Sequence, residues 1–285
     1  MFEEMINTIQ LGDCYELIKN IPDHSIDCVY VDVPYLIATD GGLNNGLGKR
    51  KIKQKFQLEC ISKLYNESKT PSENLRIAKN KFARDCMLME ANSNIVDGFE
   101  YKKFIDEAIR VMKKCNMFIW LSSLQMLDIM SYLNEKIKEQ PNILVWCKTN
   151  PIPTTNNLWL SDIEYCLYIR EKGVKLNDGY ELKSKWYVSP INQSDKDKFN
   201  HPTIKPLELV KRHILHSTQP NDIVLDCFCG SGTTCVAAKE TGRRYIGMEI
   251  DPEYHKIAVD RLNGILANGQ TTIFTDFSQI GGNND

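Results

Sequence analysis

The sequence DIVLDCFCGSGTT (222–234) decides the fold, because it joins a short apolar run to a turn that contains two glycines. The run predicts a buried strand, and the residues after the turn predict the start of a helix. Gly230 and Gly232 permit unusual backbone angles and let a ligand approach the main chain. Thr233 or Thr234 is expected to cap the helix. A strand, a glycine turn and a helix in this order indicate a ligand-binding turn in an α/β sheet.

The details of this turn narrow the class of ligand. A dinucleotide-binding turn needs a third glycine where Cys235 stands, and a phosphate-binding P-loop needs a lysine after Gly232. Asp226 would repel a phosphate, but it would attract a cation such as the ammonium group of a methionine. The next predicted strand ends at Glu249, where an acid can accept both ribose hydroxyls. A cationic tail and a ribose without a phosphate together indicate S-adenosylmethionine.

Apolar runs alternate with amphipathic stretches over most of the chain. This alternation predicts a mostly parallel, doubly wound α/β sheet of seven strands in a single domain, residues 1–285. Gly242 and Gly269 stand where two of the helices are expected to end. The predicted strands span residues 26–33, 116–122, 142–148, 163–169, 222–228, 243–250 and 271–277, and the predicted helices span residues 101–114, 124–139, 206–218, 233–242 and 252–269.

Two polar segments interrupt the alternation, at about residues 36–98 and 171–200. Residues 49–84 carry eleven Lys and Arg against three Glu, whereas the whole chain has a net charge of −2. A concentrated basic segment is typical of proteins that bind a polyanion such as nucleic acid. The alternative interpretation is a solvated loop without a partner, which is what most charge runs are.

The composition is that of an ordinary globular protein, with 42% hydrophobic and 25% charged residues. The N-terminus has no signal-peptide pattern, and no apolar run is long enough to span a membrane. The ten cysteines include no Cys-x-x-Cys pair and no Cys/His cluster at zinc spacing. We therefore expect reduced, structural cysteines, no metal site and no membrane contact, in a soluble, cytoplasmic protein. The Asn-, Lys- and Ile-rich composition indicates a bacterial or phage genome.

A second motif, IDCVYVDVPYL (26–36), predicts a buried strand that ends in a polar turn. Methyl transfer to an exocyclic amine needs acceptors for the N–H groups, because the nitrogen lone pair is delocalised into the ring. Asp32 and the carbonyl of Val33 can supply two such acceptors. Pro34 would fix the turn, and Tyr35 can stack on a base swung out of the duplex. Alone, the tetrapeptide is unspecific.

Together these motifs resemble the amino-methylating DNA methyltransferases, and specifically the permuted group in which the catalytic motif precedes the cofactor motif. Four blocks occur in that group's order. LGDCYELIKNIPDHSIDCVYVDVPY (11–35) is similar to the opening block, and WCKTNPIPTTNN (146–157) to the middle block. HPTIKPLELVKRHI (201–214) and DIVLDCFCGSGTTCVAAKETGRRYIGMEIDPEY (222–254) resemble the two remaining blocks. The resemblance covers most of residues 11–262, except the insertion at 36–98.

The resemblance implies a Rossmann-like methyltransferase fold with S-adenosylmethionine as the cofactor and double-stranded DNA as the partner. The insertion at 36–98 would face DNA, and the segment at 171–200 would recognise the target. The catalytic residues would be Asp32, Val33, Pro34 and Tyr35. The cofactor would be held by Asp13, His201, Thr203, Lys205, Asp226, Phe228, Gly230, Gly232, Thr233 and Glu249.

The first residue of the tetrapeptide bears on the target base. In the family an aspartate there usually goes with adenine N6 and a serine with cytosine N4, so Asp32 favours adenine. Val33 departs from the family's proline. Its carbonyl is retained, but valine does not fix φ, and we expect a less preorganised loop.

Several alternatives stay open at this point. The chain can be a cytosine-N4 or RNA methyltransferase, or a DNA-binding homologue that has lost catalysis. A dinucleotide oxidoreductase is disfavoured by Cys235. The permuted group contains dimers, but the sequence identifies no interface. It does not say whether a cognate restriction endonuclease accompanies the protein.

Overall fold

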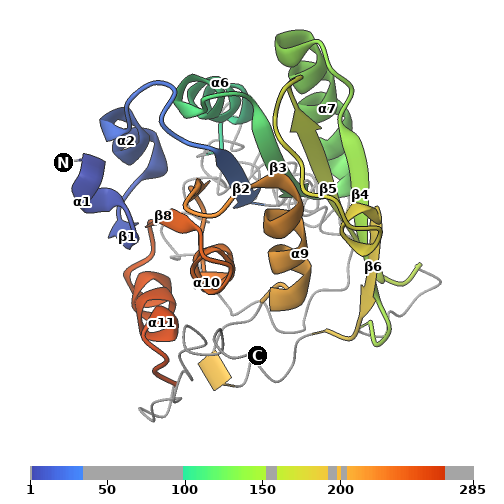
Figure 1. Ribbon diagram of the computed structural model, residues 1–285. Coiled ribbons are helices and arrows are strands. Elements are labelled where there is room, and N and C mark those ends of the chain that lie inside the picture. Colours follow the sequence, from blue (N-terminus) through green and yellow to red (C-terminus); the bar gives the residue numbers. More distant parts are fainter. Residues whose placement is uncertain (1, 35–98, 152–158, 192–197, 200–203, 267–285) are drawn as a thin grey trace, which may run out of the picture.

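The computed structural model describes residues 2–34, 99–151, 159–191, 198–199 and 204–266 of the chain. In these ranges eight strands form a single sheet in the order β1-β8-β7-β2-β3-β5-β4-β6 (Figure 1). Strand β5 is antiparallel to both of its neighbours, and all other pairs are parallel. The strands are β1 Thr8–Leu11, β2 Cys28–Asp32, β3 Asn116–Leu121, β4 Asn142–Lys148, β5 Ile163–Arg170, β6 Trp186–Ser189, β7 Ile223–Asp226 and β8 Arg244–Glu249.

The mostly parallel, doubly wound α/β sheet is confirmed, but the predicted number of strands is wrong. Two edge strands were not predicted, β1 and β6. Each has only four residues; β1 has a single buried residue and β6 has none, so neither forms the long apolar run that marks a central strand. The predicted strand at 271–277 lies outside the described residues.

Helices cover both faces of the sheet, and each face has its own hydrophobic core. One core joins α6 (Tyr101–Val111) and α7 (Ser123–Ile137) to one set of alternate strand residues, together with α1 (Phe2–Met5) and α2 (Cys14–Leu17). The other core joins α9 (Leu207–Ser217), α10 (Thr233–Glu240) and α11 (Pro252–Leu262) to the opposite set. Two 3-10 helices complete the described elements, η1 (Ile18–Asn20) and η2 (Glu181–Lys183).

The ends of several predicted helices need correction. Helix α6 ends at Val111 and α11 at Leu262, both earlier than predicted. After α11, Asn263 and Gly264 leave the helix, and Gly264 has φ 70°, which stops it. Gly242 has φ 73° directly after α10, so its predicted place at the end of that helix is confirmed. Gly269 lies outside the described residues. None of the helices in the described ranges has the length and apolar character of a membrane span.

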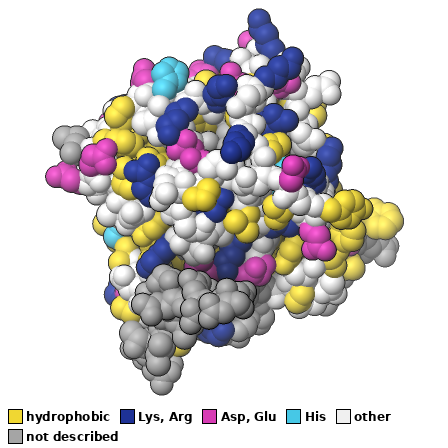
Figure 2. All heavy atoms as spheres, in the orientation of Figure 1, with side chains coloured by type: hydrophobic (Ala, Val, Ile, Leu, Met, Phe, Trp, Pro, Cys, Tyr) yellow, Lys and Arg dark blue, Asp and Glu magenta, His cyan; other side chains and the backbone are white. Residues whose placement is uncertain are grey.

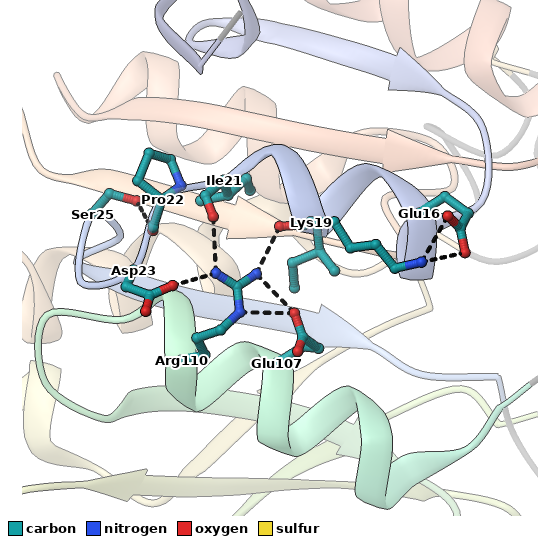
Figure 3. A network of polar contacts seen from close by, with 9 residues as sticks. Glu16, Lys19, Ile21, Pro22, Asp23, Ser25, Glu107 and Arg110 are labelled. Carbon is teal, nitrogen blue, oxygen red and sulfur yellow. Dashed lines mark hydrogen bonds and ion pairs between the residues drawn. The ribbon is translucent and has the colours of Figure 1, made fainter.

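Arg110 of α6 fastens the chain segment that leads into β2 (Figure 3). Its guanidinium donates to the carbonyls of Ile18 at 3.0 Å and Ile21 at 3.1 Å, and it pairs with Asp23 at 2.6 Å. Glu107, one turn earlier on α6, holds the same guanidinium at 2.8 Å. One side chain therefore fixes the entry of β2 against the helix that follows it in the chain.

The order of the strands creates a switch point between β7 and β2. After β7 the chain crosses through α10 to β8 on one side, and after β2 it continues through α6 to β3 on the other side. In open α/β sheets, ligands bind at the carboxyl ends of the strands beside such a point. The aspartates that end these two strands, Asp226 and Asp32, are therefore the centre of the candidate site.

Candidate active site

The glycine turn follows β7 and is closed by the packing of two helices. Gly230 has φ 49° and Gly232 has φ 76°, so both adopt the left-handed conformation expected from the sequence. A Cβ atom on Gly232 would lie 3.0 Å from the Cβ of Ala258 in α11. A side chain at Gly232 would therefore press on α11, so this glycine lets the turn pack closely on that helix. The two glycines also leave a cradle of bare main chain that a ligand can approach.

The predicted threonine cap of α10 is wrong. Gly232 itself is the N-cap residue, and Thr233 and Thr234 lie buried in the first turn of the helix. Their hydroxyl groups form hydrogen bonds to neighbouring elements and do not cap the helix. Thr233 accepts a hydrogen bond from Arg261 of α11 at 2.7 Å, and Thr234 hydrogen-bonds to Asp226. Both threonines therefore stabilise the turn through their contacts to α11 and β7.

Asp226 ends β7 beneath the turn and is 3% exposed. Its Oδ1 accepts from the backbone N–H of Phe228 at 3.1 Å. Burial raises the pKa of Asp226 to about 7, and the nearby carboxylates of Asp32 and Glu249 add to the rise. A buried acid among other acids gains stability from a bound cation, which fits the ammonium group of a methionine.

Glu249 ends β8 and holds the glycine turn in place. Its two carboxylate oxygens accept from the backbone N–H groups of Gly230 at 2.8 Å and Asp251 at 2.9 Å. Each carboxylate oxygen can accept more than one hydrogen bond, so the predicted contact to ribose remains open to this residue. Sequence reasoning had assigned Glu249 to the ligand alone, and the structure adds a role in shaping the turn.

Asp13 and Phe228 flank the turn. Asp13 is the N-cap of α2 and accepts from the backbone N–H of Tyr15 at 2.9 Å. It follows β1, whose Leu11 is the register partner of Glu249, so Asp13 lies at the same edge of the sheet. The ring of Phe228 packs on Phe99 and Phe104, at centroid distances of 5.5 Å and 5.3 Å, which ties the turn to the helix α6 side.

The catalytic motif leaves the sheet at Asp32, and two hydrogen bonds hold the residues after it. The backbone N–H of Val33 donates to the carbonyl of Trp120 at 3.1 Å and so extends the pairing of β2 with β3. The carbonyl of Pro34 accepts from Gln125 Nε2 at 2.8 Å. A proline at 33 has no N–H to make the first bond. The expected loosening at Val33 is therefore offset by a bond that the family's proline cannot form.

The carboxylate of Asp32 belongs to a chain of ion pairs. Lys205 Nζ lies 2.6 Å from Asp32 Oδ2 and 2.8 Å from Glu164 Oε2, and Lys148 Nζ lies 2.8 Å from Glu164 Oε1. Lys205 also lies over the ring of Trp120, 5.1 Å from its centroid. Burial would raise the pKa of Glu164, but the two lysines outweigh it and lower the pKa to about 2.

The other oxygen of Asp32 is arranged differently. Oδ1 is buried, and it has no hydrogen-bond partner among the residues that the structure describes. The side chain as a whole is 37% exposed. A buried acceptor without a partner is costly to a fold and calls for an explanation, and a ligand that donates to it is one. The arrangement leaves one carboxylate oxygen available to an N–H donor.

The structure thus brings the two predicted motifs together and adds a contact for one predicted residue. Lys205 was expected near the methionine part of the cofactor, and its ammonium pairs with Asp32. Tyr35, His201 and Thr203 lie outside the described residues, as do the basic insertion at 36–98 and parts of the segment at 171–200. In the described ranges, no three His, Cys, Asp or Glu side chains gather as a metal site, and Cys227 and Cys229 are buried and free.

Sequence reasoning missed three residues of the site, namely Glu164, Gln125 and Trp120. A signal exists for Glu164, because an acid inside the apolar run IEYCLYI (163–169) must be paired if the strand is buried. Trp120 and Gln125 carry no such signal. Their contacts join strands and helices that are about 90 residues from the catalytic motif.

Comparisons with known proteins agree with this geometry. A family model described as DNA methylase matches residues 26–260. The Type II methyltransferase M2.LlaDCHI of Lactococcus lactis subsp. cremoris is 29% identical over 267 residues, covering 88% of this chain and 87% of the relative. The Type II methyltransferase M.HinfI of Haemophilus influenzae is 29% identical over 287 residues, covering 93% and 70%.

Two solved structures share the fold. The M1.HpyAVI–SAM complex superposes with a TM-score of 0.58 at 24% identity, covering 90% of this chain and 98% of that one. The cytosine-N4-specific PvuII DNA methyltransferase superposes with a TM-score of 0.59 at 14% identity, covering 89% and 85%.

Proposed function

The chain belongs to the family of DNA methylases that modify exocyclic amino groups, and from this premise we propose that it methylates N6 of an adenine flipped out of double-stranded DNA. The observation that carries the proposal is the pair of aspartates at the switch point. Asp226 lies under a glycine cradle that suits the cofactor, and Asp32 beside it holds an unpartnered oxygen that suits an amine.

The cofactor of the family is S-adenosylmethionine, which supplies a methyl group on a positively charged sulfur. The residues of this chain fit that group. The cradle at Gly230 and Gly232 lets the main chain approach it, and Asp226 offers a carboxylate to the ammonium group. Glu249 and Asp13 line the same edge of the sheet, where ribose and adenine would lie.

The reaction forms a bond between the amine nitrogen and the methyl carbon, breaks the bond between that carbon and the sulfonium sulfur, and releases one proton from the nitrogen. Asp32 Oδ1 is the atom available to accept an N–H of the amine, which raises the electron density on the nitrogen and orients it. The carbonyl of Val33 would accept the second N–H, and Tyr35 would stack on the flipped base. Asp32 then takes the proton as the nitrogen becomes cationic.

The choice of adenine over cytosine rests on the resemblance. A tetrapeptide that begins with Asp32 favours adenine N6 in this family, and no contact in the described residues tests that preference. Cytosine N4 and an inactive DNA-binding homologue are the competing outcomes. The Type II names of the relatives support a restriction–modification role for this chain, in which a cognate endonuclease would cut the same unmethylated site. A homodimer remains a prediction.

The test is a methylation assay with labelled S-adenosylmethionine and unmethylated DNA, followed by digestion and identification of the modified nucleoside by mass. We expect N6-methyladenine from the wild type and none from Asp32→Ala. Asp128→Ala, an exposed aspartate on α7, is the matched control and should keep full activity. N4-methylcytosine would overturn the assignment of the base. DNA binding without methyl transfer over many sequences would favour the inactive homologue.

A further inference from the structure

Lys205 bridges two carboxylates that come from strands two places apart in the sheet. Asp32 ends β2, Glu164 lies on β5, and β3 runs between them. Asp32 pairs in register with Trp120, which pairs with Cys166, two residues from Glu164 on the same strand. All these side chains therefore point to the same face of the sheet, and the ammonium of Lys205 lies over the Trp120 ring between the acids.

Glu164 is the hub of this cluster. Its side chain is 20% exposed, and each of its oxygens lies 2.8 Å from a lysine, Lys148 or Lys205. Two acids and two lysines balance, so the cluster carries no net charge. A buried carboxylate is expensive unless it is paired, and burial between two ammonium groups keeps Glu164 ionised. Apart from Arg170 at its far end, the other residues of β5 are apolar or aromatic, so the energetic cost of an acid at position 164 calls for a functional reason.

The ammonium of Lys205 has three N–H donors on a flexible stem of four carbons. Beside a single carboxylate, such a group can shift until it contacts both oxygens. Here the second carboxylate, Glu164, draws Lys205 to one side. The hydrogen bond from Lys205 then goes to Oδ2 of Asp32, at 2.6 Å, and Oδ1 is left without a hydrogen-bond partner among the described residues.

We propose that Glu164 is a positioning residue for methyl transfer, which anchors Lys205 on Oδ2 of Asp32 and thereby keeps Oδ1 unpaired for the target amine. This inference rests on the proposed function, because it needs Asp32 to be the acceptor. Glu164 acts through Lys205 and does not itself contact the reacting atoms. Its effect should therefore fall on the chemical step and leave the binding of DNA and cofactor intact.

The variant Glu164→Gln keeps the shape of the side chain and removes its charge. Lys148 and Lys205 then lose their shared partner, and the cluster gains one net positive charge. Lys205 is driven onto Asp32, where it competes with the amine for Oδ1. Because a positioned proton acceptor contributes roughly 10²- to 10⁴-fold, we expect partial competition to lower the single-turnover rate by about 10- to 100-fold. The Kd values for DNA and S-adenosylmethionine should change by less than about threefold, since binding common to ground and transition state is untouched.

A double-mutant cycle separates positioning from general support of the fold. In a Lys205→Met background, the further change Glu164→Gln should have almost no effect on the rate, because its intermediary is gone. Glu107→Gln is the matched control: Glu107 is also partly buried and is ion-paired to Arg110 at 2.8 Å (Figure 3), but in the described structure it forms no hydrogen bond or ion pair with Asp32, Lys205 or Glu164. It should leave the rate unchanged. If Glu164→Gln does not fold, Glu164→Asp retains the charge and should keep most of the rate.

Four results would overturn the inference. They are an unchanged rate in Glu164→Gln, equal losses in both backgrounds, weakened DNA or cofactor binding that accounts for the loss, and a folded Glu164→Asp with no activity. In each of these the wild type still methylates DNA, so the proposed function stands. A wild type that transfers no methyl group to DNA overturns both.

Discussion

The change Val33→Pro restores the residue that the family's motif carries, and the structure predicts that it harms this protein. The N–H of Val33 donates to the carbonyl of Trp120 at 3.1 Å, at the point where β2 leaves the sheet. Proline removes that donor. Trp120 is 1% exposed, so water cannot replace the lost bond without a local opening of the sheet.

The size of the effect follows from two opposing terms. A buried carbonyl that loses its partner costs about 1–3 kcal/mol. The proline ring stiffens the unfolded chain, which returns about 0.4–1 kcal/mol. The net loss in the free energy of unfolding therefore lies between about 0 and 2.6 kcal/mol, with a midpoint of about 1.3 kcal/mol. For a protein of this size, about 2–4 °C of melting temperature goes with each kcal/mol, so Val33→Pro should melt a few degrees below the wild type.

Urea unfolding and thermal melts measure the loss, and the methylation assay measures its consequence at the neighbouring Asp32. Val33→Ile is the control, because it retains the N–H and the apolar side chain while adding one methylene. It should reproduce the wild-type activity even if the tight packing costs some stability. A Val33→Pro variant as stable as the wild type, with equal or higher activity, would refute the reasoning and show that the hydrogen bond to Trp120 contributes nothing.

Three further predictions concern the turn and the loop. Gly232→Ala should destabilise the protein by more than Gly242→Ala in urea unfolding, because both glycines have positive φ but only a Cβ at Gly232 meets a helix, at 3.0 Å. The extra cost should be about 1–3 kcal/mol, and equal losses would contradict the packing argument. Gln125→Leu removes the hydrogen bond to the carbonyl of Pro34 and the capping box of α7. We therefore expect thermal melts to show a loss of about 1–2 kcal/mol in the free energy of unfolding, and we expect slower methyl transfer. Because the folded pKa of Asp226 is raised to about 7 and its unfolded value is near 4, the folded protein binds more protons between these values. The free energy of unfolding should therefore fall as pH rises through this window in the wild type and stay flatter in Asp226→Asn, and parallel pH profiles would exclude the effect.

The sequence predicted the class of the fold because its signals are local. The apolar runs that became β2, β3, β5, β7 and β8 lie in the middle of the sheet, and such strands are recognisable by composition alone. The two missed strands, β1 and β6, are edge strands of four residues with half-exposed patterns. Their pairing depends on a neighbour that is far away in the chain, and no local pattern contains that information.

The candidate site divides in the same way. Asp32, Asp226, Gly230, Gly232 and Glu249 were predicted because each stands at a strand end or in a turn whose local pattern is visible. The wrong prediction, a threonine cap on α10, failed because the tight turn makes Gly232 the cap and buries the threonines after it. The local pattern predicted that their hydroxyl groups cap the helix, but in the structure these groups hydrogen-bond to residues of other elements.

Local sequence patterns could not predict the contacts around the carboxylate of Asp32, and the reason is physical. Lys205 follows Asp32 by 173 positions, and Glu164 comes from a strand that is antiparallel to its neighbours. Only the strand order brings these charges to one face of the sheet. A sequence motif identifies the atom that acts, whereas the pairing around that atom decides which of its two oxygens is free. The unpaired Oδ1 of Asp32 follows from that pairing, and it is the feature on which both the proposed methyl transfer and the positioning role of Glu164 depend.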